Sequence, residues 1–388
     1  MPMKGAHWGG SGCARALLLL PLLGFCISEA RAQWVIQQSN TTADLRGVKN
    51  AGHGVVWASG TGGTVLRTLD DGAHWQKCAI PDAARDGATL DFRGVQAWDD
   101  RNAMVMASGP GAKSRLYKTS DGCRTWKLVL KNRDKDGFWD ALYFQDRNNG
   151  WLLGDPVRGA FSLFRSKDAG RNWNRQHNKG LRASRVSEGA FAASNSSLIG
   201  VGDSVIFGTG GTGGAALYSI VDSIICIDDC PENFNLDGGH DVWSRRRAPL
   251  GQGTSSSGVF SVGWRPDSQS ATAASGVLVL VGGDFVNPNQ VRNTCAFKLS
   301  SKDQWTVSTN PPHGYRSSVQ WSEHLHAWIT VGPNGTDVSI DDGCNWRPLT
   351  PSSTDSAGAD RNWNALSLPF VVGPTGRIGR LREDTLRP

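Results

Sequence analysis

The chain has 388 residues, with 41 lysines and arginines against 35 aspartates and glutamates, so its formal net charge is +6. The basic residues form no stripe of the kind that phosphate binding needs, which argues against a nucleic-acid partner. After the first thirty residues no apolar segment approaches the ~20 residues of a membrane-spanning helix, so no membrane span is expected.

The first 32 residues have the layout of a secretory signal peptide. Lys4 and Arg15 precede an apolar run over residues 16–27, and the small-residue site Ala-Arg-Ala follows at 30–32. The run is too short to cross a bilayer, and the small-residue site predicts cleavage before Gln33. We therefore expect residues 33–388 to form one exported domain, either periplasmic or extracellular.

Four strings along the rest of the chain share one pattern: Ser or Thr, an aspartate two positions on, usually a glycine, and a final tryptophan. They are TLDDGAHW (68–75), TSDGCRTW (119–126), SKDAGRNW (166–173) and SIDDGCNW (339–346), with the aspartates Asp70, Asp121, Asp168 and Asp341 and the tryptophans Trp75, Trp126, Trp173 and Trp346. The first three aspartates are 51 and 47 residues apart, a period typical of propeller blades. A β-type run, such as GVVWASG or GWLLGD, precedes each string and predicts a strand leading into a turn.

The residue types of these strings suit a tight turn. An aspartate carboxylate can accept hydrogen bonds from backbone N–H groups further along the turn, and glycine supplies a positive φ. The tryptophan buries a large aromatic area between sheets. Because the pattern occurs four times in one chain, we interpret it as structural rather than catalytic. Cys123 replaces the glycine of the second string, which leaves a disulfide or an altered turn open at that position.

The pattern Ser/Thr-x-Asp-x-Gly-x-x-Trp resembles the Asp-box, also called the bacterial neuraminidase repeat. Sialidases, some glucanases and the photosystem II stability/assembly factor family with its bacterial relatives carry this repeat on β-propellers. The strings GWLLGD (150–155), VGPNGTDVSIDDGCNW (331–346) and FVVGPTGRIGRL (370–381) look most like the last family. The resemblance covers most of residues 33–388 and implies an all-β propeller, but it is weak for activity.

Strand-end glycines give the number of blades. Seven can be followed along the chain: Gly60, Gly109, Gly154, Gly208, Gly282, Gly332 and Gly373. The sequence therefore predicts a seven-bladed β-propeller with Asp-box turns. Too few residues follow Gly373 for a complete blade, whereas residues 33–40 form a spare strand before the first repeat. We expect this N-terminal strand to close the ring, beside residues 377–381, so that no sheet edge stays open.

Six cysteines follow the signal peptide, and an even number in an exported chain permits disulfides. Cys226 and Cys230 are the pair that we predict from their spacing. The connectivity of the others is left open: Cys78, Cys123, Cys295 and Cys344. A zinc site is less favoured because no second close Cys or His pair accompanies the first. We expect neither a metal nor a cofactor.

The starts of the innermost strands carry the candidate binding residues. The strings LRGVKNA, FRGVQAW and YRSSVQW align Arg46, Arg93 and Arg316 at one repeat position, expected at the mouth of the central channel. Close to the same level we expect the side chains of Asp140, Glu188 and Asn364. A ring of guanidinium groups suits a carboxylate or an acidic peptide. The alternative is that each arginine pairs with a neighbouring carboxylate and ties blades together.

Two functions remain open. The first is a non-catalytic binding or assembly-factor-like propeller, expected as a monomer, that holds a protein or peptide partner on one face. The second is a glycoside hydrolase of sialidase-like type, for which Asp140, Asp155, Glu188 and Asp284 could supply a pair of carboxyl groups. The chain lacks the Arg-Ile-Pro motif of sialidases and has only four tyrosines, which favours binding.

Overall fold

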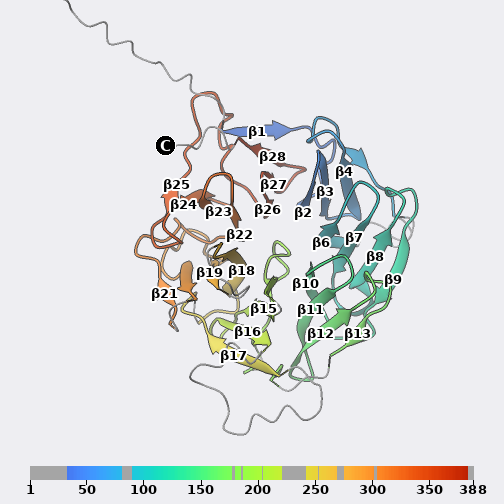
Figure 1. Ribbon diagram of the computed structural model, residues 1–388, viewed down its shortest axis with the longest axis horizontal. Coiled ribbons are helices and arrows are strands. Elements are labelled where there is room, and N and C mark those ends of the chain that lie inside the picture. The colour runs from blue at the N-terminus through green and yellow to red at the C-terminus, as the bar shows by residue number, and fades with distance from the viewer. Residues whose placement is uncertain are drawn as a thin grey trace, which may run out of the picture. The chain divides into compact units, whose positions relative to one another are not determined.

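The computed structural model describes residues 33–80, 90–176, 180–184, 187–202, 204–220, 242–251, 253–268, 275–300 and 304–382. The expected signal peptide and the expected Cys226–Cys230 pair lie outside these residues. The described strands form seven four-stranded antiparallel sheets, and Figure 1 shows them following one another around a ring. The protein is a seven-bladed β-propeller, as the repeats predict.

Each blade has four strands, numbered here from the channel outwards. The innermost strands are β2 (Leu45–Gly52), β6 (Asp91–Ala97), β10 (Trp139–Phe144), β14 (Leu198–Val201), β18 (Ser257–Pro266), β22 (Ser318–Ser322) and β26 (Ala365–Ser367). The second strands are β3 (Val55–Gly60), β7 (Ala103–Ser108), β11 (Gly150–Val157), β15 (Ser204–Thr209), β19 (Gly276–Asp284), β23 (Ala327–Gly332) and β27 (Phe370–Val372). Every strand-end glycine used for counting lies in or directly after one of these second strands.

The third strands are β4 (Thr64–Thr68), β8 (Arg115–Thr119), β12 (Ala160–Ser166), β16 (Ala216–Ile220), β20 (Cys295–Leu299), β24 (Gly335–Ser339) and β28 (Ile378–Leu381). The outermost strands are β5 (Gln76–Lys77), β9 (Lys127–Lys131), β13 (Asn174–Arg175), β17 (Trp243–Arg247), β21 (Thr306–Val307), β25 (Arg347–Pro348) and β1 (Trp34–Gln37). Among the described residues the only helical element is a single 3-10 turn, η1 (Gly111–Lys113), and no helix is long and apolar enough to cross a membrane.

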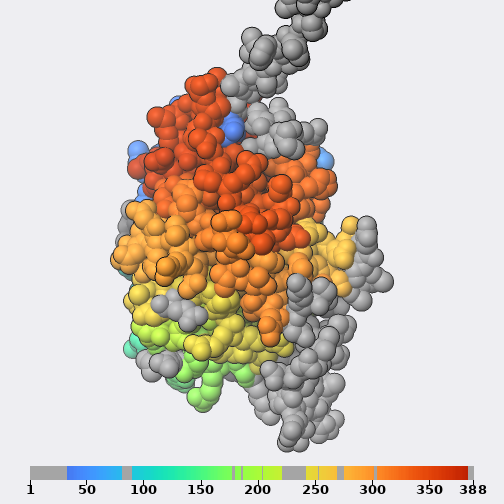
Figure 2. All heavy atoms as spheres, turned by 90° about the vertical axis from the view of Figure 1, so that its left-hand side faces the viewer, coloured from blue at the N-terminus to red at the C-terminus, as the bar shows by residue number. Residues whose placement is uncertain are grey.

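The N-terminal strand closes the ring. Strand β1 pairs antiparallel with β28, with Trp34 opposite Leu381 and Gln37 opposite Ile378. The last blade therefore has the order β1-β28-β27-β26, with three strands from the end of the chain and one from its beginning. In Figure 2, blue atoms of the N-terminal part lie directly beside the red atoms of the C-terminal blade. The predicted closure is confirmed.

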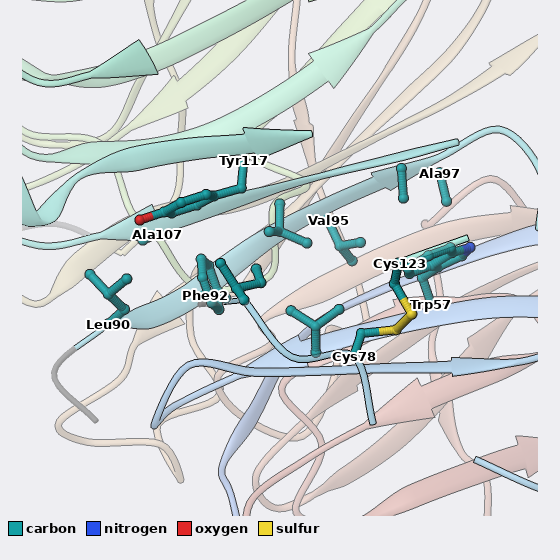
Figure 3. Packing of buried hydrophobic residues seen from close by; sticks show 13 residues of the cluster. Trp57, Cys78, Leu90, Phe92, Val95, Ala97, Ala107, Tyr117 and Cys123 are labelled. Carbon is teal, nitrogen blue, oxygen red and sulfur yellow. A yellow bond between two sulfur atoms is a disulfide. The ribbon is translucent and has the colours of Figure 1, made fainter. Parts of the chain in front are cut away.

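The hydrophobic core lies between neighbouring blades rather than within one sheet. One cluster joins Trp57 and Val65 of the first blade to Phe92, Val95 and Tyr117 of the second, as Figure 3 shows for most of its members. A similar cluster joins the last blade to the first. Because each blade buries its faces against its neighbours, the stability of one blade depends on the next.

The four aspartate turns share one set of hydrogen bonds. In the turn after β12, Ser166 donates to Asp168 through its hydroxyl (2.9 Å) and accepts from the backbone N–H of Gly170 (2.9 Å). Asp168 accepts from the backbone N–H of Asn172 (2.9 Å) and from its side-chain amide (2.7 Å). Equivalent bonds hold the turns that contain Asp70, Asp121 and Asp341.

A disulfide joins the first two blades. Cys78 follows β5, and Cys123 holds the second positive-φ position of the aspartate turn after β8, with φ 61°. Their sulfur atoms are bonded, and both side chains are buried in the cluster of Figure 3. Of the other described cysteines, Cys295 is buried and free, and Cys344 is partly buried and free.

Candidate functional site

One end of the central channel opens into a cavity of about 590 Å³, which we call the arginine mouth. Its walls come from the starts of the innermost strands, from the ends of some second strands and from the segment that precedes β14. The lining residues are Arg46, Arg93, Phe138, Asp140, Asp155, Ala190, Phe191, Ala192, Ala193, Phe260, Phe285, Tyr315, Ser317, Pro333, Trp363 and Asn364. Four of the six predicted mouth residues are therefore gathered there: Arg46, Arg93, Asp140 and Asn364.

β-Bulges bring four of these side chains to the cavity. In four blades the pairing between the innermost and second strands skips one residue, which is Arg46, Arg93, Asp140 or Phe260. An extra residue in one strand bends it locally and re-aims the side chain of that residue. The repeated bulge therefore explains why non-identical residues at one repeat position share the same cavity.

The two arginines of this cavity have different partners. Arg93 donates from Nε to Asp91 Oδ2 (2.8 Å) and from Nη1 to the carbonyl oxygen of Ala192 (3.2 Å). Arg46 makes no hydrogen bond or ion pair with any described residue, and its Nε is buried without a partner. The guanidinium group of Arg46 is therefore free to bind an oxygen acceptor from outside the chain.

Asn364 lies at the junction of the last blade with the first. Its side-chain amide donates to the carbonyl oxygen of Leu45 (2.8 Å), the residue before Arg46. This bond fixes the start of β2, and with it the position of Arg46. Asn364 thus lines the cavity and supports the free arginine at the same time.

Two carboxyl groups in the cavity wall have raised pKa values. Burial raises the pKa of Asp140 well above its ordinary value, and the charge of Asp155 adds to this effect, whereas Arg93 opposes it. Burial also raises the pKa of Asp155 to about 6, although a hydrogen bond from the backbone N–H of Ala190 (3.0 Å) partly offsets the shift. Asp140 is 1% exposed although it lines the cavity, so little of its carboxyl group is open to solvent.

Aromatic rings make up much of the remaining wall. Phe191 stacks on Phe260 with 3.9 Å between ring centroids, and Tyr315 meets Phe260 edge-to-face at 4.8 Å. The guanidinium group of Arg93 lies 6.0 Å from the ring centroid of Phe138. Phe285 is half exposed at the rim. The cavity therefore offers apolar contact area next to its cationic groups.

Arg316 does not line this cavity, which corrects the predicted alignment. In the sixth blade Ser318 pairs with Val331, the backbone N–H of Ser317 donates to the same Val331, and Ser317 rather than Arg316 takes the lining position. The side chain of Arg316 is fully buried within its blade. Its Nε donates to Asp337 Oδ2 (2.7 Å), and its Nη1 donates to Asn334 Oδ1 (2.6 Å). For this arginine the alternative of an internal ion pair holds.

Glu188 also lies outside the arginine mouth. Its buried carboxylate accepts hydrogen bonds from the N–H of Ser184 (2.6 Å), the hydroxyl of Thr209 (2.8 Å) and Nε of Arg245 (3.1 Å). Burial acts to raise the pKa of Glu188, but these hydrogen bonds and the charge of Arg245 bring it below its ordinary value. The carboxylate anchors the segment before β14 and is saturated by internal partners.

That segment crosses the channel, which the repeat pattern could not reveal. Ser194 donates to the carbonyl oxygen of Ser317 (2.6 Å), and Asn195 exchanges hydrogen bonds with the backbone of Leu142 (2.7 and 2.9 Å). Ser196 donates to the hydroxyl of Ser261 (2.7 Å). Residues 190–193 line the arginine mouth, and residues 194–196 line a second cavity on the other side. We call residues 190–196 the channel segment.

Within the described part of the chain, no group of three or more His, Cys, Asp or Glu side chains is placed to hold a metal ion. Arg46, Arg93 and the aromatic rings of the lining give the arginine mouth the groups to recognise an anion, with aromatic contacts beside it.

Comparisons with known proteins bear on the fold alone. No family model matches the chain, and no curated protein matches its sequence. Solved structures do match. YCF48 bound to a D1 peptide has a TM-score of 0.58 at 15% identity, covering 90% of this chain and 96% of that one. YCF48 from Cyanidioschyzon merolae has a TM-score of 0.56 at 16% identity, covering 91% and 100%.

A GH74 xyloglucanase from Xanthomonas campestris also matches, with a TM-score of 0.54 at 15% identity. This match covers 90% of this chain but 54% of the enzyme. At such identities the matches show a shared architecture and leave the activity to the residues of the site. The chain is a YCF48-like seven-bladed propeller in its fold.

Proposed function

We propose that this protein is an exported, non-catalytic propeller that binds an acidic peptide segment of a partner protein at the arginine mouth. The observation that carries the proposal is the free guanidinium group of Arg46. It lines a cavity of about 590 Å³ and has no hydrogen-bond or ion-pair partner among the described residues. A cation in a partly buried site gains most from an anionic partner that replaces its lost water.

The chemistry of the walls defines the ligand further. A carboxylate can accept two parallel N–H bonds from the fork of Arg46. Arg93, held by Asp91 and Ala192, adds positive charge on the neighbouring blade. The rings of Phe191, Phe260 and Phe285 suit an apolar side chain next to the carboxylate. An acidic peptide with a flanking apolar residue combines both requirements.

A propeller of the same fold supports this use of the scaffold, because YCF48 has been solved with a D1 peptide bound. We infer an assembly-factor-like role for this protein on that precedent and on the free guanidinium group of Arg46 in the cavity. We also infer that it acts as a monomer, since one ring contains the whole cavity.

Two features support export. The first 32 residues have the pattern of a signal peptide. Cys78 and Cys123 form a disulfide, a bond that persists in oxidising compartments and is rare in the cytosol. Together they favour a periplasmic or extracellular location.

A glycoside hydrolase is the second candidate, because Asp140 and Asp155 stand in the same wall and burial raises the pKa of both. Such a pair could in principle divide the roles of acid and base. However, Asp140 is 1% exposed and its Oδ2 is buried without a partner, so little of its carboxyl group is open to a substrate in the cavity. This burial favours binding over catalysis.

The test is a pull-down with the immobilised mature protein from the envelope fraction of its own host. Three proteins are compared: the wild type, Arg46→Ala/Arg93→Ala, and Arg347→Ala as a matched control on the exposed strand β25. The wild type and the control should retain the same partner, and the double variant should lose it. A synthetic acidic peptide from that partner should then bind roughly 10- to 100-fold more weakly to Arg46→Ala, which loses about 1.5–3 kcal/mol of charge-assisted hydrogen bonding.

The proposal fails if the folded double variant retains the same partner as the wild type. A parallel screen on aryl glycosides and xyloglucan tests the second candidate. If the wild type turns over a glycoside and Asp140→Asn abolishes this turnover without a change in melting temperature, the protein is a glycoside hydrolase and the binding proposal is wrong.

A further inference from the structure

The opposite end of the central channel holds a second cavity, of about 410 Å³. Along each innermost strand its residues follow those of the arginine mouth: Lys49 comes three residues after Arg46, and Gln96 three residues after Arg93. At ~3.3 Å per residue, the two sites are roughly 10 Å apart along the strands. The channel segment lies between them, so each cavity is a separate cup rather than one end of an open pore.

One side of this second cavity carries two unused hydrogen-bond donors. Lys49 pairs across its sheet with Trp57, and Gln96 pairs with Met104, so the two side chains occupy equivalent positions on neighbouring blades. Both are partly buried, and neither makes a hydrogen bond or ion pair with the described residues. An ammonium group and an amide N–H₂ placed side by side suit the two oxygens of a carboxylate.

The other side is aromatic. Trp264 comes from β18 and Trp321 from β22, and both side chains are partly buried in the lining. Trp321 is held in place by Trp328, with 5.4 Å between ring centroids, and by the guanidinium group of Arg265, 4.8 Å from its ring centroid. Two indole side chains in the same lining as a pair of donors give this cavity an apolar part and a polar part.

We propose that this cavity, the lysine mouth, binds a small aromatic carboxylic acid. The carboxylate is held by Lys49 and Gln96, and the ring lies against Trp264 and Trp321. The proposal concerns a different end of the channel from the peptide site and does not depend on it.

The titratable groups around Lys49 agree with an unmet need for an anion. Burial lowers the pKa of the Lys49 ammonium, with no carboxylate acting to raise it. The other titratable groups of the lining are Tyr143, whose pKa burial raises, and Glu323, which is exposed at the rim. An incoming carboxylate would therefore be the first strong anion near Lys49 and should raise its pKa.

Calorimetric titration with phenylacetate and with its neutral isostere phenylacetamide tests the proposal. The titrations use the Arg46→Ala/Arg93→Ala background, so that the arginine mouth contributes nothing. Phenylacetate should bind with one site per chain and at least tenfold more tightly than the amide. At alkaline pH its binding should take up protons, seen as a dependence of the heat on the buffer's ionisation enthalpy.

Lys49→Met should weaken phenylacetate at least tenfold and leave the amide unchanged, whereas Lys127→Met, a matched change on the exposed strand β9, should alter neither. Two outcomes overturn the proposal in the protein that retains Lys49: equal affinities for phenylacetate and phenylacetamide, or no binding of either compound at tens of millimolar. Retention of phenylacetate affinity by folded Lys49→Met also overturns it. None of these outcomes bears on the peptide site.

Discussion

At the scale of single residues, Arg46 and Arg316 show how one position in register changes the role of a guanidinium group. Arg46 sits at a bulge and lines a cavity without a partner. Arg316 comes one residue before the lining position, which Ser317 holds, and is fully buried against Asp337, which is 1% exposed. The first is free for a ligand, and the second neutralises a buried charge.

Arg316→Ala should therefore destabilise the protein strongly. Removing one partner of a buried ion pair leaves the other charge uncompensated, which typically costs about 3–5 kcal/mol. Urea unfolding should show this loss, whereas Arg46→Ala should stay within about 0.5 kcal/mol of the wild type because no internal bond is removed. Equal losses for the two variants would mean that Arg46 also serves as a tie between blades.

Asp155 should make peptide binding depend on pH. Its pKa is raised to about 6 by burial, so it takes up a proton as the pH falls from 7 to 5. Loss of this negative charge makes the arginine mouth more positive, while the carboxylates of the peptide stay ionised. We expect acidic peptides to bind more tightly at pH 5 than at pH 7, by on the order of 1 kcal/mol.

The measurement is the affinity of one acidic peptide across this pH range in the wild type and in Asp155→Asn. In this variant the side chain at position 155 carries no charge at either pH, so the affinity for the peptide should change much less between pH 7 and pH 5 than it does in the wild type. A wild-type affinity that falls as the pH falls would contradict the assignment.

The sequence could identify Arg46, Arg93, Asp140 and Asn364 because they share a repeat position that the strand pattern reveals. Arg316 was placed wrongly because its alignment is shifted by one residue: the Val-Gln pair that follows Gly94 recurs after Ser318, so Ser317 corresponds to Arg93. Glu188 was misplaced for a different reason. The segment before β14 leaves the repeat and crosses the channel, and its hydrogen bonds connect distant parts of the chain.

At the scale of elements, the aspartate turns make the blades sensitive to acid. Backbone and side-chain hydrogen bonds from His74, Thr125 and Asn172 lower the pKa values of Asp70, Asp121 and Asp168 to about 2. In the unfolded chain an aspartate has a pKa of about 3.9. Between these values the unfolded state binds more protons, so the stability that the turns contribute is complete above about pH 4 and is lost as the pH falls towards 2.

Urea unfolding between pH 5 and pH 2 should show this decline. Asp168→Asn carries no titrating group at this turn and should lose less stability over the same range than the wild type, although it starts lower. Parallel curves for the two proteins would show that this turn does not couple to folding.

The Cys78–Cys123 disulfide should be a major source of stability for the first two blades. It closes a loop with a sequence separation of 45, for which the chain-entropy model gives about 4 kcal/mol. Cys78→Ser/Cys123→Ser should lower the free energy of unfolding by that order. Reduction of the wild type with dithiothreitol should have the same effect, and it should leave the double variant unchanged, which is the control.

The sequence indicated the turns because their residue types follow from backbone chemistry within eight residues. It left a disulfide at Cys123 open but did not identify Cys78 as the partner, because the two cysteines are brought together only when two blades pack face to face. Sequence spacing favoured Cys226 and Cys230 instead, and that pair stays a prediction.

At the scale of the whole molecule, closure of the ring should decide its stability. Deleting residues 33–41 removes β1 and exposes the edge of β28, which pairs with it over four residues. It also uncovers Trp363 of the last blade, on which the deleted Trp34 stacks with 5.5 Å between ring centroids. The truncated protein should therefore melt well below the wild type in differential scanning calorimetry and should aggregate through its open edge. A melting temperature equal to that of the wild type would contradict the role of β1.

The architecture as a whole was open to prediction because it repeats. A period of about fifty residues and a glycine at each second strand define the blades. The last repeat is one strand short and the N-terminus has one strand to spare, so the N-terminal strand must close the ring. Segments that differ between blades cannot be predicted from the repeat. The channel segment is one of them, and it lines both cavities.

The pairing of Trp34 with Leu381 also sets an order of events during synthesis. A ribosome adding about 5–20 residues per second needs roughly 20–70 s to reach the partner of a strand that it made first. Throughout that time strand β1 has no partner strand. Blades that have already formed lack the neighbouring blade against which they pack. A chaperone or the export machinery must keep β1 apart from other chains during this interval. The yield of folded protein then depends on this protection, because β1 has to remain available to close the ring.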